Sequence, residues 1–422
     1  MMIKRKHNWI TLCLFNLALV AMLGAVLRSK ILFSIPWLDF KYILNAHSHF
    51  AFGGWITLCL LTLFTYELLP EKFSSQRKYN CLLGSIFLSA AGMLVSFPFQ
   101  GYGFWSISFS TLFIFATYAF SWFFIRDLRR SGVPGYIFQL AVIALLALCI
   151  SSVGPFTLAY MLATHSANLL LYKDSIYTYL HLQYNGFFTL AIFAIWFGRI
   201  SHSWTGKTRQ QAARFAGLLS VSVLPTLFLS YLWHYPNILI RSIAVSGCML
   251  LVACLNYFIP VFKTAWAGLR FGSKPLRILT GLAMTAFFAK TLMQAGIVYP
   301  ALGALIFDNR PVIIGYLHLV MLGFVTLFLL AHLFLNGYFS PASKPTIWGI
   351  ILFTAAVMIN ELLLMTQGLA AMLSASCSFF PLWLWLTALL LFGGALVIAL
   401  GAVDYRRSLR RELSTETTKS LT

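Results

Sequence analysis

The sequence predicts an all-α polytopic membrane protein, a bundle of twelve transmembrane helices. Of its 422 residues, 60% are hydrophobic and only 9% are charged, whereas about 25% of the residues of a soluble domain are charged. The mean hydropathy is +0.84. The apolar residues fall into runs of about 20 residues or more, the length that a helix needs to cross a bilayer. These observations exclude a soluble globular protein.

Hydropathy places the twelve helices in order along the chain. The fifth contains Gly154 and Pro155 and should be kinked there, because proline lacks a backbone donor. The connections are short, so residues 1–403 are expected to form one membrane domain, followed by a mobile polar tail at 404–422. The predicted helices lie near residues 8–27, 42–68, 80–98, 104–125, 136–162, 175–198, 212–235, 238–262, 274–298, 311–338, 345–368 and 378–403.

The basic residues predict the topology. With the N-terminus inside, 23 of the 30 Lys and Arg residues lie in inner segments and 6 in outer segments. The excess predicts a multi-pass protein of a bacterial-type inner membrane with both termini cytoplasmic. The net charge of +20 is then explained by topology and by attraction to anionic membrane lipid, so no nucleic-acid partner is expected.

The cysteines form no CxxC or CxxCH motif, which excludes covalent attachment of a c-type haem.

Six of the nine histidines are predicted to lie at one depth, in the outer third of the membrane. Histidine is costly inside a bilayer and usually faces a partner, a cofactor or water. Imidazole is also the usual ligand of haem iron and copper. His47 and His49 are two residues apart and point about 200° apart on a helix, so the sequence leaves open which of them binds a cofactor. The six are His47, His49, His165, His181, His234 and His318.

Four further polar residues are candidates for the chemistry of such a site. Lys290 and Glu361 are predicted at similar depths, where they would form either a buried ion pair or part of a proton relay. Tyr231 lies three residues before His234, on the same helical face, and is either a redox tyrosine or an ordinary packed side chain. Arg310 opens the tenth helix two turns before His318, and a haem propionate would need such a basic partner.

The motifs around these histidines resemble those of the haem–copper oxidase superfamily. They are FGGW after His47 and His49, HLQYNGFF from His181, the Trp233-His234 pair, and His318 with Gly323 five residues later. The resemblance is closest to the C-family oxidases and nitric oxide reductases. It implies the subunit I type of twelve-helix bundle. It also implies at least one low-spin haem b between helices two and ten, bound by His318 and by His47 or His49.

The same resemblance implies a copper site built from His181 and His234. His165 is the expected third ligand, because it lies on the same side of the membrane. Electrons would come from a membrane or periplasmic donor, either a partner subunit or a cytochrome, and the protein would be an oxidoreductase of the oxygen or nitric oxide reductase type.

The chain departs from the superfamily at Tyr316. The superfamily has His-x-His on helix ten, whereas this sequence has Tyr316-Leu317-His318. A second haem would therefore have a phenolate ligand or none on that face. Ordinary oxygen-reducing turnover is accordingly not expected. Two alternatives remain: a protein similar to the NnrS-like family, which is linked to nitric oxide resistance without respiratory turnover, and a multi-pass transporter.

Overall fold

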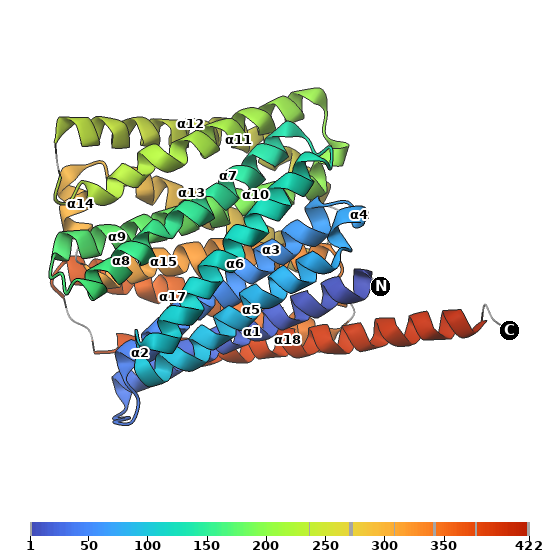
Figure 1. Ribbon diagram of the computed structural model, residues 1–422, viewed down its shortest axis with the longest axis horizontal. Coiled ribbons are helices and arrows are strands. Elements are labelled where there is room, and N and C mark those ends of the chain that lie inside the picture. The colour runs from blue at the N-terminus through green and yellow to red at the C-terminus, as the bar shows by residue number, and fades with distance from the viewer. Residues whose placement is uncertain are drawn as a thin grey trace.

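The computed structural model describes residues 2–235, 237–269, 273–307, 309–340, 343–375 and 378–419 (Figure 1). Within these ranges every regular element is helical. Twelve helices in them are long and apolar enough to cross a membrane. The predicted class, an all-α multi-pass membrane protein, is thereby confirmed.

Several of the twelve spans consist of more than one helical element, and we number the spans one to twelve along the chain. The α-helices are α1 (Met2–Leu32), α2 (Phe40–Phe50), α3 (Leu58–Leu63), α4 (Glu71–Ser74), α5 (Arg77–Gln100), α6 (Phe104–Arg129), α7 (Gly135–Ser151), α8 (Val153–Ala163), α9 (Leu169–His181), α10 (Thr189–Ile200), α11 (Gly206–Leu227), α12 (Ile238–Gly268), α13 (Lys274–Gly296), α14 (Pro300–Ile306), α15 (Arg310–His318), α16 (Leu327–Leu335), α17 (Lys344–Met372) and α18 (Phe380–Lys419). Short π or 3₁₀ segments are η1 (Ala51–Thr57), η2 (Phe64–Leu68), η3 (Leu182–Phe188), η4 (Ser201–Ser203), η5 (Phe228–Tyr231) and η7 (Leu319–Thr326).

Each span corresponds to one predicted helix, but some ends differ. Span seven stops at Tyr231 instead of 235, so His234 lies in the turn beyond it. The short helix α14, between spans nine and ten, was not predicted. The polar tail expected from residue 404 begins as a continuation of the last helix, because α18 extends to Lys419. Residues 420–422 lie outside the described residues.

The predicted interruption of the fifth span is present. Helix α7 ends at Ser151 and α8 begins at Val153, because Pro155 has no N–H with which to continue the hydrogen-bond ladder. The neighbouring Gly154 lets α8 approach α9 closely: a Cβ there would lie 2.5 Å from the Ser175 carbonyl oxygen.

Spans two, six and ten each contain a π-helical segment directly after their predicted ligand histidines. These segments are η1, η3 and η7. Such segments are rare and occur frequently at functional sites. Each contains a glycine five residues after a histidine: Gly54 after His49, Gly186 after His181 and Gly323 after His318.

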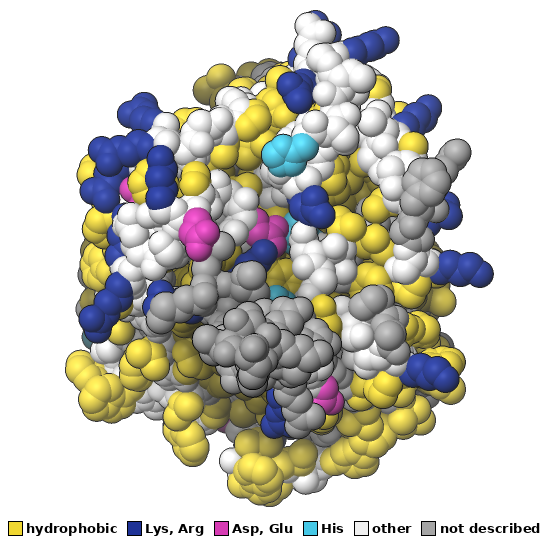
Figure 2. All heavy atoms as spheres, turned by 90° about the vertical axis from the view of Figure 1, so that its right-hand side faces the viewer, with side chains coloured by type: hydrophobic (Ala, Val, Ile, Leu, Met, Phe, Trp, Pro, Cys, Tyr) yellow, Lys and Arg dark blue, Asp and Glu magenta, His cyan; other side chains and the backbone are white. Residues whose placement is uncertain are grey.

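Burial separates interior spans from peripheral ones. In the most apolar stretch of spans two and six, 83% and 89% of the residues are buried, against 33% and 28% in spans three and four. The spans that carry His47 and His181 are therefore at the centre of the bundle. Both termini lie at one end of the bundle, which we call the terminal end (Figure 1). Lys and Arg side chains surround this end (Figure 2).

Candidate cofactor site and buried polar clusters

His47 and His49 face different neighbours, as their spacing predicts. The Nδ1 atom of His47 lies 3.1 Å from the Val20 carbonyl oxygen of α1. The Nε2 atom of His49 instead lies 3.0 Å from the Tyr102 hydroxyl, and its ring stacks on Phe97 with centroids 4.6 Å apart. Burial raises the pKa of Tyr102 to about 12, so this phenol stays protonated and can donate to His49.

His318 is held in the same way as His47. Its Nδ1 atom lies 2.8 Å from the carbonyl oxygen of Ile314, one turn earlier in α15. A carbonyl oxygen only accepts, so Nδ1 must carry the proton in both rings and Nε2 must carry the lone pair. Within the described part of the chain neither Nε2 makes a hydrogen bond, and both side chains are only half-buried. Metal-binding histidines are commonly oriented by such a hydrogen bond from the other ring nitrogen.

His47, His318 and Arg28 lie within electrostatic range of one another. His47 interacts electrostatically with His318 and Arg28, and Arg28 also acts on His318. A hydrogen bond of 3.1 Å from the Trp55 indole to the Thr326 hydroxyl connects η1 to η7 and so fixes spans two and ten relative to each other. Of the two histidines that the sequence left open, His47 is the one that lies near His318.

The sequence analysis named Arg310, which is exposed at the first position of α15, and did not single out Arg28. The signal was present on the first helix. Val20, Gly24 and Arg28 are spaced at i, i+4 and i+8 and so share one helical face. His47 lies against that face, because a Cβ on Gly24 would be 3.4 Å from the imidazole Cε1.

His181 belongs to a separate buried chain of hydrogen bonds. Its Nε2 atom lies 2.9 Å from the Val223 carbonyl oxygen, and its Nδ1 atom lies 3.2 Å from the Asn185 amide nitrogen. The Lys290 ammonium donates to the Asn185 side-chain oxygen at 2.7 Å and to the Thr189 hydroxyl at 3.2 Å. The chain therefore connects α13 to α11 through span six, and it occupies both nitrogens of His181.

Among the described residues, the structure does not bring the three predicted copper ligands His165, His181 and His234 together in one group. His234 lies 3.0 Å from the Asp174 carboxylate, in the turn after η5, and His165 is exposed in the turn after α8. Among the described residues there is no group of three His, Cys, Asp or Glu side chains that could hold a metal ion. Both nitrogens of His181 are engaged in hydrogen bonds, and helix seven ends before His234.

Lys290 and Glu361 do not form the ion pair that was one of the two predicted alternatives. Lys290 is bonded to span six, whereas Glu361 accepts a hydrogen bond of 3.2 Å from its neighbour Asn360. The two charged groups therefore form no ion pair. The Tyr231 hydroxyl is hydrogen-bonded to Thr178 at 2.6 Å, which ties η5 to α9.

Tyr316 and His318 point to different neighbours, in agreement with their spacing. The Tyr316 ring packs edge-on against Tyr184 of η3, with centroids 5.8 Å apart. Its hydroxyl is buried and lacks a hydrogen-bond partner among the described residues.

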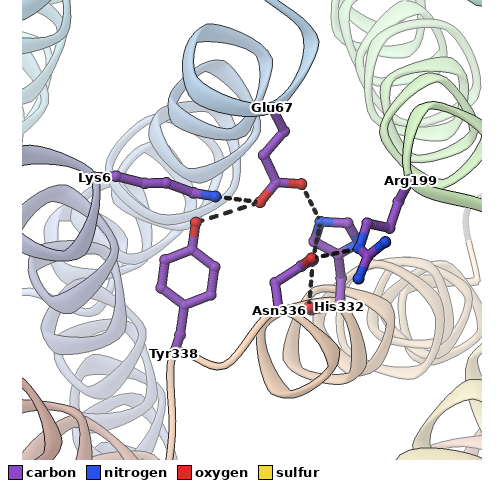
Figure 3. Close-up of polar contacts among 6 residues, drawn as sticks. All are labelled: Lys6, Glu67, Arg199, His332, Asn336 and Tyr338. Atoms are coloured by element: carbon purple, nitrogen blue, oxygen red, sulfur yellow. Dashed lines mark hydrogen bonds and ion pairs between the residues drawn. The ribbon is translucent and has the colours of Figure 1, made fainter. Parts of the chain in front are cut away.

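A second polar cluster, at the terminal end, was not predicted (Figure 3). Glu67 of η2 lies 2.6 Å from His332 Nε2, 3.0 Å from the Lys6 ammonium and 3.3 Å from the Tyr338 hydroxyl. Asn336 extends the cluster, with its amide nitrogen 2.9 Å from His332 Nε2. The ion pairs connect spans one, two and ten. The sequence contains one signal of this cluster, Glu67 inside an apolar run, but it does not indicate which residues contact Glu67.

No protein-family model matches the chain, and no match is found among curated proteins. The functional argument therefore depends on the site itself.

Proposed function

We propose that this protein is a haem-binding integral membrane redox protein, with a low-spin haem b held between spans two and ten by His47 and His318. One observation carries the proposal. Both histidines direct Nδ1–H to a backbone carbonyl and so present an uncommitted Nε2 lone pair, on two spans that Trp55 and Thr326 connect. Imidazole in this tautomer is the form that ligates haem iron.

The residues around the two histidines fit a haem. Arg28 is the cation within electrostatic range of both imidazoles, and a guanidinium group is suited to bind a propionate carboxylate in bidentate fashion. A bound haem would supply one-electron transfer. The chain itself supplies two neutral ligands and the compensating charge. His49, hydrogen-bonded to Tyr102, takes no part.

We include in the proposal a fold of the same type as that of the haem–copper oxidases, but we do not include a copper centre. Both nitrogens of His181 are hydrogen-bonded, which leaves no ligand atom where the superfamily binds copper. Tyr316 takes the place of the second haem ligand. We therefore propose electron transfer, or a reaction with a small oxidant such as nitric oxide, and not ordinary oxygen reduction.

The proposed orientation follows from charge. Basic side chains surround the terminal end (Figure 2), and basic residues favour the cytoplasm. In a bacterial inner membrane the haem would then lie nearer the opposite, periplasmic face, within reach of a periplasmic or membrane electron donor.

The test is an absorption spectrum of the purified protein, produced with haem available to the cells. The reduced protein should show the sharp bands of a low-spin haem b, and extraction should yield one haem per chain. Protein that remains colourless after reconstitution with haem would refute the proposal.

The hydrogen-bonded chain through Lys290, Asn185 and His181 favours a second candidate, an ion-coupled transporter. A buried ionisable residue without an acidic partner commonly marks an ion pathway in a membrane protein. Colourless protein whose reconstituted vesicles take up protons in response to a solute would support this candidate instead.

A further inference from the structure

A groove at the terminal end of the bundle is separate from the proposed haem site, and the proposed function does not use it. It has a volume of about 420 Å³, within the range of about 300–1,000 Å³ typical of ligand sites. It lies between spans eight and nine, and only 33% of the most apolar stretch of span eight is buried. The groove is lined by Trp266, Lys274, Arg277, Ile278, Gly281 and Leu282.

The sequence builds this groove from one face of α13. Lys274, Arg277, Ile278 and Gly281 follow the spacing i, i+3, i+4 and i+7, which places them on the same side of a helix. Gly281 leaves room for the Trp266 ring, since a Cβ there would lie 3.3 Å from it.

The two cations in the groove have no acidic partner among the described residues. Neither Lys274 nor Arg277 forms an ion pair with any residue that the structure describes, and no acidic side chain lines the groove. The Arg277 guanidinium lies over the Trp266 ring, 5.4 Å from its centroid, and its Nε is buried without a hydrogen-bond partner in the part of the chain that the structure describes. The groove therefore offers hydrogen-bond donors and positive charge to an anion.

We propose that this groove binds an anionic phospholipid from the leaflet at the terminal end. The phosphate would contact Lys274 and Arg277, and an acyl chain would lie along Ile278, Gly281 and Leu282. A lipid accounts for both the basic and the apolar part of the groove, because a free phosphate would make no contact with the apolar part. Tryptophan is enriched at the level of lipid headgroups, and basic pockets between membrane helices commonly bind anionic headgroups.

The test is native mass spectrometry of the full chain in detergent, with phosphatidylglycerol or phosphatidylcholine added at equal concentration. Phosphatidylglycerol should remain bound and phosphatidylcholine should not. Each basic residue near a membrane surface contributes about 1 kcal/mol, so the double variant Lys274→Gln/Arg277→Gln should weaken phosphatidylglycerol binding about 30-fold. The control Lys207→Gln/Arg209→Gln removes the same charge from exposed positions at the start of α11, at the same end, and should leave binding unchanged.

Three results would overturn the proposal: equal retention of both lipids, an unchanged affinity in the double variant, or displacement of the lipid by inorganic phosphate. The last would indicate a site for free phosphate. Should the double variant fail to elute as the wild type does, the comparison of the two lipids on wild-type protein still decides the question. A Gly281→Leu variant tests the apolar half, because the added side chain meets Trp266 and should reduce lipid retention with no change of charge.

Discussion

Exchanging one histidine of the His47/His49 pair for alanine separates the proposed ligand from its neighbour. His47→Ala removes the imidazole whose Nδ1 is held by Val20 and whose Nε2 is available. His49→Ala removes a ring that lies two residues away but is bonded to Tyr102 and stacked on Phe97. The two variants are closely matched controls, since they make the same chemical change in the same helix.

The expected magnitudes differ because only one variant removes a ligand. Loss of a residue that merely orients a metal ligand lowers metal affinity by about 10–100-fold, equivalent to about 1.4–2.8 kcal/mol. Loss of the ligand itself should exceed that range, so His47→Ala should lose the low-spin haem. His49→Ala should cost about 0.5–1.5 kcal/mol of stability, the net value of one hydrogen bond, because the bond from His49 to Tyr102 is exposed to solvent, and the variant should keep its haem.

The assay is the reduced-minus-oxidised absorption spectrum of each purified variant, with the haem content per chain measured after extraction. His318→Ala should behave as His47→Ala does, since it removes the opposite ligand. Sharp low-spin bands that survive in His47→Ala and vanish in His49→Ala would refute the assignment based on the Val20 and Ile314 hydrogen bonds.

Three further substitutions test other parts of the structure. Arg28→Gln should keep the haem but lower its reduction potential by roughly tens of millivolts, because a propionate loses its compensating charge; an unchanged potential in a redox titration would count against Arg28 as the partner. Glu67→Gln should lower the free energy of unfolding by about 3 kcal/mol, because two charge-assisted hydrogen bonds of about 1.5 kcal/mol each are lost. Thermal unfolding should show this loss but no comparable change for Glu71→Gln, which alters an exposed acid nearby. Tyr316→His should allow a second haem that binds carbon monoxide, and a haem content that stays at one per chain would contradict the role given to Tyr316.

The sequence by itself determined the class of this protein and the positions of its spans. Both depend on properties that are local along the chain: an apolar run must be about 20 residues long to cross a bilayer, and Pro155 interrupts a helix wherever the helix lies. The same local reasoning predicted that His47 and His49, like Tyr316 and His318, leave their helices in different directions, because helical rotation per residue is constant.

Only the tertiary structure decided which of these side chains meet. His47 is near His318 because Trp55 and Thr326 connect spans two and ten, whose residues are far apart in sequence. His181 lies in a buried hydrogen-bonded chain because packing places Asn185 and the Val223 carbonyl against its two nitrogens. A histidine at the right depth predicts a buried polar contact, but hydropathy holds no information on the rotation of one helix against another, and that rotation selects the partner.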